Sequence, residues 1–261
     1  MGQKTSRTVV FRYFLSIAGM KFLLTTFTAL MLFFNIDASA IANKKDKILI
    51  FSLTKSYRHK SIADGILAIK KLALANNFDV DTSESVAAFT KENLQQYQTL
   101  VFLNPTGSNV FSDEQKQALK TYINNGGGLL GIHAATDFCF EWEWYGKLIG
   151  AFFTNHPKVQ QAKLISVKPK DKLMKGMPQS WLHTDEWYNF KSFNKDVTVL
   201  VKVDETSYQG GKMDNEHPIV WYHKFDGGRV FYTGLGHTAA AYSDPLFLKQ
   251  LLAGLKWTMR K

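Results

Sequence analysis

Cysteine is nearly missing from this sequence, which has a single one, Cys139, among 261 residues. One thiol excludes an intramolecular disulfide and a zinc site built from four cysteines. The chain also lacks internal repeats, low-complexity tracts and long linkers, so one domain is the simplest organisation. Its hydrophobic and charged fractions, 45% and 21%, are ordinary for a soluble globular protein. A chain of this length can bury a substantial core without disulfides or a structural metal.

Acidic residues are fewer than basic ones, and the formal net charge is +10. The lysines are scattered rather than packed into a stripe, and no nucleic-acid-binding motif accompanies them. We therefore expect a basic soluble surface and no nucleic-acid partner. A glycine-rich phosphate cradle is missing from the first loop, residues 53–60, which argues against a redox flavoprotein.

The first forty residues have the pattern of a secretory signal. Lys21 precedes the apolar run 22–36, and Ala38-Ser39-Ala40 follows with the small residues that a signal peptidase needs. We expect residues 1–40 to be a signal peptide with an upstream extension, cleaved after Ala40, and the protein to be periplasmic or secreted. The alternative is an uncleaved membrane anchor, although the run is short for a span of about 20 residues. Any membrane contact is expected through this segment only.

The first half of the remaining chain alternates between strand and helix patterns. Apolar runs predict strands at residues 47–52, 99–104 and 128–133, and residues 78–82 are a candidate for a further strand. A helix is predicted from residue 62, and another follows the S-x-x-Q capping box of residues 112–115. Strands that are apolar throughout and separated by helices indicate a parallel sheet that is covered on both faces.

The second half is less regular and richer in strand patterns. Strands are predicted at residues 159–167 and 197–203, and two more, 219–225 and 229–233, flank the turn Asp226-Gly227-Gly228. Apolar spacing predicts a terminal helix over residues 245–259. We interpret residues 152–213 as a β-rich elaboration of the core sheet.

Several motifs follow one another in a characteristic order. They are Tyr57-Arg58-His59, the GGGLLGIH of residues 126–133, Asp185-Glu186-Trp187-Tyr188, His217-Pro218 and the GRVFYTGLGH of residues 228–237. From about Lys47 to the C-terminus, the chain thereby resembles the ThuA-like (trehalose-utilisation) family. The resemblance implies that residues 41–261 form one ThuA-like α/β domain. It implies a flavodoxin-like, class I glutamine amidotransferase-like three-layer sandwich, with a mostly parallel sheet and a β-rich insertion. It also implies action on trehalose-type glucosides or 3-keto sugars.

The sequence departs from the amidotransferases at the nucleophile. In those relatives the glycine-rich turn presents a cysteine, whereas here the corresponding turn presents His133. A glutaminase needs a thiolate at that point, and an imidazole does not replace it in the same acyl chemistry. Cys139 comes six residues later and is expected to be a small packed side chain. We therefore expect no glutamine amidotransferase activity.

Three histidines lie at the ends of predicted strands and are the main candidates for catalysis. Open parallel sheets bind ligands outside the carboxyl ends of their strands, so we expect His59, His133 and His237 to converge there. Neutral imidazoles near pH 7 act as bases, acids or metal ligands. Glu186 is the preferred carboxylate, either as a general base or to orient a histidine. For each residue, the alternative is a surface or hydrogen-bonded structural role.

The other four histidines are weaker candidates. His156 and His217 each precede a proline, where a structural turn explains the pattern at least as well. His183 and His223 are interpreted as structural.

Aromatic and polar residues near these positions are candidates for binding a sugar, whose C–H faces pack on aromatic rings. Trp142 and Trp144, in the cluster of residues 141–145, form the preferred sugar-facing wall. The remaining candidates for substrate binding are Tyr57, Arg58, Asp185, Trp187 and Tyr188.

A divalent metal such as zinc is one option for this site, with His59, His133 and His237 as candidate ligands. No local pair such as H-x-x-x-H supports a metal, and proton transfer without one stays equally open. The first hypothesis is an enzyme, a lyase, hydrolase or isomerase, that uses histidine and carboxylate proton transfer on a glucoside or 3-keto sugar. A glycosidase needs two opposed carboxylates, and Glu186 has no evident partner. The alternative is a non-catalytic carbohydrate-binding protein on the same fold.

Overall fold

Four parallel strands from the first half of the chain make one side of a nine-stranded sheet. They are β1 (Lys47–Phe51), β2 (Asp79–Ser83), β3 (Thr99–Leu103) and β4 (Gly128–Ile132), in the spatial order β2-β1-β3-β4. Every residue of β3 and β4 is buried. The apolar runs therefore form the parallel strands that the sequence predicts. The structure is a computed structural model, and it describes Gly2 and residues 45–261.

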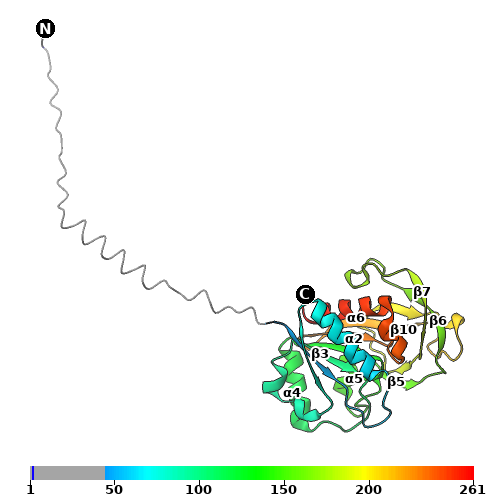
Figure 1. Cartoon of the computed structure of the whole chain (residues 1–261), viewed down its shortest axis with the longest axis horizontal. Helices are drawn as coiled ribbons and strands as arrows, with labels where there is room; N and C mark the ends of the chain where they lie inside the picture. Colours follow the sequence, from blue (N-terminus) through cyan, green and yellow to red (C-terminus); the bar gives the residue numbers. More distant parts are fainter. Residues whose placement is uncertain (1, 3–44) are drawn as a thin grey trace. The chain divides into compact units, whose positions relative to one another are not determined.

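Helices cover both faces of this sheet (Figure 1). They are α2 (Ile62–Ala75), α3 (Lys91–Leu94), α4 (Asp113–Asn124), α5 (Glu143–Ile149) and α6 (Pro245–Thr258). Neighbouring residues of β3 show the two faces: a Cβ on Gly65 of α2 would meet Leu103, while the ring of Phe102 stacks on Tyr145 of α5. The capping box that starts α4 is confirmed, because Ser112 and Gln115 each bond the backbone of the other. This is the three-layer, flavodoxin-like arrangement that was expected.

The second half extends the same sheet with antiparallel strands. Its strands are β6 (Gln160–Ser166), β7 (Ser180–Asp185), β9 (Thr198–Val203), β10 (His217–Phe225) and β11 (Gly228–Thr233). β11 pairs in parallel with β4, and the order continues β11-β10-β9-β6-β7. Asp226 and Gly227 both have positive φ, as the turn of a tight hairpin requires, so the predicted hairpin is confirmed. β5 (Phe152–Asn155) and β8 (Asn189–Lys191) form a separate two-stranded sheet.

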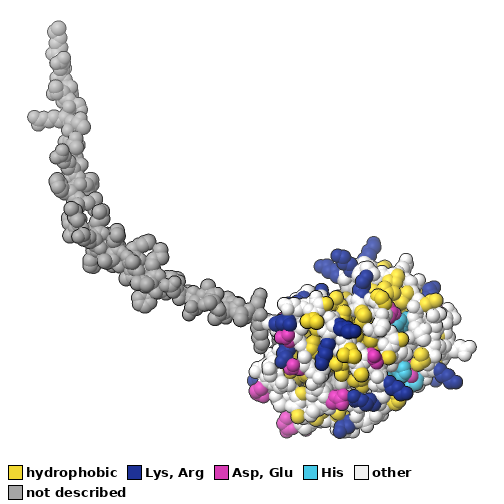
Figure 2. Space-filling view, viewed as in Figure 1, with side chains coloured by type: hydrophobic (Ala, Val, Ile, Leu, Met, Phe, Trp, Pro, Cys, Tyr) yellow, Lys and Arg dark blue, Asp and Glu magenta, His cyan; other side chains and the backbone are white. Residues whose placement is uncertain are grey.

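Short 3-10 helices connect these elements: η1 (Val86–Ala88), η2 (His133–Thr136), η3 (Lys172–Met174), η4 (Glu205–Ser207) and η5 (Ala239–Ser243). Basic side chains are spread among acidic and apolar ones on the face drawn in Figure 2. Within the described part of the chain, no helix is long and apolar enough to cross a membrane. The predicted signal peptide and its cleavage after Ala40 lie outside the described residues.

The strand that was expected to end at His133 ends one residue earlier. His133 has a φ of 46°, which breaks the extended conformation and starts η2. The turn and α5 both pack closely on this strand, because a Cβ on Gly131 would lie 3.1 Å from Ala135 of η2 and 2.4 Å from Ile149 of α5. A histidine in this left-handed conformation is uncommon, and such conformations cluster at functional sites.

Candidate functional site

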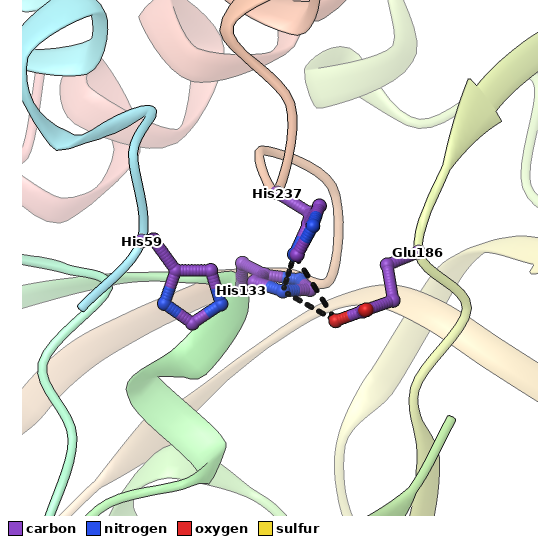
Figure 3. Close-up of side chains that lie close together, drawn as sticks. All are labelled: His59, His133, Glu186 and His237. Atoms are coloured by element: carbon purple, nitrogen blue, oxygen red, sulfur yellow. Dashed lines mark hydrogen bonds and ion pairs between the residues drawn. The ribbon is translucent and has the colours of Figure 1, made fainter. Parts of the chain in front are cut away.

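Three strands of the parallel part of the sheet place three histidines at their carboxyl ends. His59 lies in the loop after β1, His133 follows β4 directly, and His237 lies in the loop after β11. The strand order β1-β3-β4-β11 brings these carboxyl ends together. Figure 3 shows the three rings turned toward one another, with Glu186 reaching in from the segment after β7. We call these four residues the histidine cluster.

Glu186 lies beside the three histidines although it follows β7, which is the last strand on the other side of the sheet. Its neighbour Asp185, which is fully buried, makes the link. One carboxylate oxygen of Asp185 accepts the backbone N–H of Gly236 at 2.7 Å, and the other accepts that of His237 at 3.1 Å. The same carboxylate accepts the N–H of Glu186 at 3.0 Å. Asp185 therefore ties together the two segments that carry His237 and Glu186.

The atoms at the centre of the histidine cluster are close to one another. His133 Nε2 lies 3.3 Å from His237 Nδ1 and 3.5 Å from Glu186 Oε2. His237 Nδ1 lies 3.1 Å from the same carboxylate oxygen. The ring centroid of His59 is 4.9 Å from that of His133 and 5.2 Å from that of His237. Ligand-type atoms of all four side chains lie within 4.8 Å of one another, so these residues could hold a metal ion.

A hydrogen bond to a backbone carbonyl determines which ring nitrogen of His133 carries the proton and which has the lone pair. His133 Nδ1 lies 2.8 Å from the carbonyl oxygen of Gly234, which can only accept a hydrogen bond. Nδ1 therefore carries the proton in the neutral ring, and Nε2 points its lone pair at Glu186 and His237.

Together, burial and the neighbouring charges lower the pKa values of His59 and Glu186 and raise the pKa of His237. His59 is 2% exposed, and burial, together with nearby His133 and His237, lowers its pKa to about 2. Burial alone would raise the pKa of Glu186, but hydrogen bonds and charges from His133 and His237 lower it to about 2. Burial opposes protonation of His237, yet Glu186 raises the pKa of that ring. Near neutral pH, His59 is thus neutral and Glu186 is ionised.

Two residues near the cluster were not among the predicted site residues. His156 Nδ1 lies 2.9 Å from Glu186 Oε1, and its side chain is 41% exposed. His156 follows β5 directly, and the proline after it was the only feature of the sequence that marked this position. Asp137 follows the turn that His133 starts, and burial, aided by the charge of Glu186 and opposed by His156, raises its pKa to about 6.

Two of the predicted aromatic residues lie beside the histidine cluster. The ring of Tyr188 is 4.0 Å from that of His133, centroid to centroid, and is almost fully buried. Tyr57 meets His59 edge to face at 4.9 Å, and it is 57% exposed. His156 and His237 are partly exposed, at 41% and 19% of their side chains, whereas His133 is fully buried.

The two tryptophans expected to form the sugar-facing wall lie elsewhere. Trp142 is buried between Phe111 and Trp144, within range of lysines of α4. Trp144 donates its indole N–H to Asp226, in the turn at the opposite end of β11. A dense aromatic segment indicates core packing as readily as sugar binding, and the contacts of these two rings are of the packing kind.

Three further binding candidates also have other partners. Arg58 points to Glu84, with 2.6 Å between their charged atoms, and not to the cluster. Trp187 is fully buried and donates its indole N–H to the carbonyl of Gln160 at 3.0 Å. Asp185 is occupied by backbone N–H groups, so it positions the site rather than facing a ligand.

The remaining histidines lie outside the cluster. His183 contacts Asp244 at 2.9 Å and Asp185 at 3.5 Å, and although burial opposes it, these carboxylates raise the pKa of its ring. His223 bonds the carbonyl of Leu148. His217 is not only a turn residue, since one ring nitrogen bonds the carbonyl of Tyr188 at 2.8 Å and the other lies 3.0 Å from Glu205.

Cys139 is buried away from any base, and burial raises the pKa of its thiol far above the usual range. It has no thiolate at neutral pH with which to attack a carbonyl. The chemistry that the site offers is therefore that of imidazole and carboxylate groups: proton transfer, stabilisation of an oxyanion and metal binding.

Comparison with known proteins gives a family and a fold. Residues 47–258 match the model of the family ThuA, described as trehalose utilisation. A ThuA-like protein from Bacteroides uniformis superposes with a TM-score of 0.68 at 23% identity, over 82% of this chain and 91% of that one. A ThuA-like protein from Parabacteroides merdae gives 0.68 at 19% identity, over 82% and 90%. A cytoplasmic protein from Salmonella typhimurium gives 0.59 at 13% identity, over 82% and 98%. No curated protein matches this sequence.

Proposed function

The chain belongs to the ThuA family, and from this premise we propose that it is an enzyme acting on a 3-keto form of a trehalose-type glucoside. The observation that carries the proposal is the convergence of His59, His133, Glu186 and His237 from four separate segments. Burying a carboxylate and several imidazoles costs free energy, and a core of apolar residues would be cheaper. Perturbed groups gathered at one point of a sheet edge are typical of an active site.

We assign the role of base to His156, oriented by Glu186. His156 Nδ1 lies 2.9 Å from the carbonyl oxygen of Pro157 and 2.9 Å from Glu186 Oε1, and both of these oxygens are acceptors. Nδ1 therefore carries the proton, and the lone pair of the neutral ring is on Nε2. This ring is also the most exposed one around Glu186, so a substrate can reach it. Glu186 itself is a poor base, since its pKa is lowered to about 2, and the same low pKa argues against His59.

A ketone at C3 of the sugar acidifies the C–H bond at C2. In the proposed step His156 Nε2 takes this proton, and the electron pair moves through the C2–C3 bond onto the ketone oxygen. His237, whose proton is favoured by Glu186, stabilises the enolate oxygen. Return of a proton to C2 from the other face gives an isomer. Departure of the C1 oxygen substituent with its bonding electrons instead gives an elimination product.

The sugar ring itself would be bound at the exposed side of the histidine cluster. Tyr57 offers an exposed aromatic ring directly beside His59, suited to a C–H face of a sugar. This takes over the role that the sequence assigned to Trp142 and Trp144, whose rings pack elsewhere.

The proposal is tested by incubating the full chain with trehalose and with 3-keto-trehalose in D₂O and following both sugars by proton NMR. We expect the C2 proton signal of the keto sugar to disappear by exchange, followed by product signals, while trehalose, which has no ketone, stays unchanged. If the keto sugar binds in a titration but shows neither exchange nor product, the enzyme proposal fails and the non-catalytic carbohydrate-binding alternative takes its place.

A further inference from the structure

We propose that His59, His133, Glu186 and His237 bind one divalent transition-metal ion such as Zn²⁺. The inference deepens the proposed function and rests on it for the role of the ion at that site. Binding of the ion is nevertheless measurable without a substrate.

The spacing of the cluster atoms matches a tetrahedral ligand set. With Zn–N and Zn–O distances of about 2.0–2.1 Å, two ligand atoms of a tetrahedron are about 3.3 Å apart. The three separations among His133 Nε2, His237 Nδ1 and Glu186 Oε2 are 3.3, 3.5 and 3.1 Å. These three atoms thus already define one face of such a tetrahedron.

The direction of the lone pairs supports the same conclusion. His133 Nε2 presents a lone pair, because Nδ1 donates to the carbonyl of Gly234. Glu186 Oε2 is an acceptor as well, so two acceptors face each other across 3.5 Å. A hydrogen bond from the second ring nitrogen to a backbone carbonyl is the usual way in which a protein fixes a metal-binding histidine.

The ring of His59 distinguishes a metal site from a cluster that is held together by hydrogen bonds alone. A proton on His237 Nδ1 could link Glu186 and His133 without a metal. It would leave both ring nitrogens of His59 buried and without a hydrogen-bond partner, as they are in the protein itself. Buried polar atoms are nearly always paired. A cation at the centre gives His59 the partner that the protein does not supply.

The donor atoms indicate the class of metal. Three imidazole nitrogens and one carboxylate oxygen suit Zn²⁺ and its first-row neighbours, whereas Mg²⁺ and Ca²⁺ prefer oxygen ligands throughout. In the proposed reaction the bound ion would supply the positive charge that stabilises the enolate oxygen, in place of the proton on His237.

The metal content of the purified full chain tests the inference. After loading with Zn²⁺ and dialysis, elemental mass spectrometry is expected to find about one ion per chain. Cobalt loading gives a second readout, because tetrahedral Co²⁺ with nitrogen ligands absorbs visible light strongly. A metal content below about a tenth of an ion per chain in the loaded protein would overturn the inference.

Variants test where the ion is bound. We expect His59→Ala and His133→Ala each to lower the Zn²⁺ affinity at least about tenfold. His59→Ala is the safer variant, because the ring of His59 makes no hydrogen bond that the substitution would remove. The matched control is His223→Gln, a buried histidine outside the cluster, which should keep the metal. Unchanged affinity in both cluster variants would refute this site.

The failure of this inference can be told apart from the failure of the proposed function. If the metal-free protein turns over the keto sugar as fast as the loaded one, the metal role fails and the enzyme proposal stands. If the protein holds one ion in the cluster but leaves every sugar unchanged, the metal site stands and the enzyme proposal fails.

Discussion

Replacement of His133 by alanine is expected to lower the turnover of 3-keto-trehalose about 10²–10⁴-fold, because His237 and Glu186 lose the ring that positions them and acid–base catalysis is lost with that geometry. The ring contributes the lone pair that faces His237 and Glu186, and no neighbour can replace it. Sugar affinity should change by less than about threefold, because the proposed sugar contacts lie on the exposed side of the cluster. Steady-state kinetics and a calorimetric titration measure the two effects separately.

The backbone at this position calls for a second variant. His133 has a φ of 46°, which is strained for alanine, so some loss could come from the backbone alone. Asparagine tolerates this conformation better, and His133→Asn should therefore fold well and still be inactive. A His133→Asn protein with wild-type turnover would show that the imidazole has no part in the reaction.

Asp185→Ala is expected to have the largest effect on stability. The carboxylate accepts three backbone N–H groups, those of Glu186, Gly236 and His237. All three would lose a partner that is itself fully buried, at about 1–3 kcal/mol each. Because the N–H of His237 is only partly buried, we expect the lower part of this sum, a fall of roughly 3–6 kcal/mol in the free energy of unfolding, measured by urea denaturation.

The same substitution should also abolish turnover, because the two segments that carry Glu186 and His237 are no longer tied together. The exposed Asp196 provides the control, since Asp196→Ala should change stability by less than about 0.5 kcal/mol. A loss below about 1 kcal/mol for Asp185→Ala would show that these hydrogen bonds do not hold the site.

Local sequence signals were enough to predict the core of the fold. Strands β3 and β4 are buried on both faces, and such strands have to be apolar throughout, so their runs of residues are unambiguous. The start of α4 was predictable because Ser112 and Gln115 complete a capping box. The hairpin was predictable because the positive φ values of Asp226 and Gly227 suit these residue types.

The three histidines of the cluster were predictable for a different reason. In a parallel sheet the carboxyl ends of adjacent strands share one edge, so residues that follow β1, β4 and β11 meet there whatever their distance in the chain. Glu186 could be nominated as a carboxylate but not placed, since β7 is at the far edge and its path depends on the insertion.

Other parts of the site depend on contacts that leave no local pattern. His156 precedes a proline, and only the fold shows that its ring meets Glu186. Asp185 and Glu186 are adjacent, and only the fold shows that Asp185 bonds backbone N–H groups while Glu186 faces histidines. For Trp142 and Trp144, burial in the core and exposure to a sugar predict the same residue types, so the composition does not separate them.

The most direct test of the account is a crystal structure of the full chain soaked with 3-keto-trehalose. The account predicts sugar density at the histidine cluster, in contact with Tyr57 and His237, with C2 of the keto ring within reach of His156 Nε2. Density confined to the surface around Trp142 and Trp144, with the cluster side chains untouched by sugar, would contradict it.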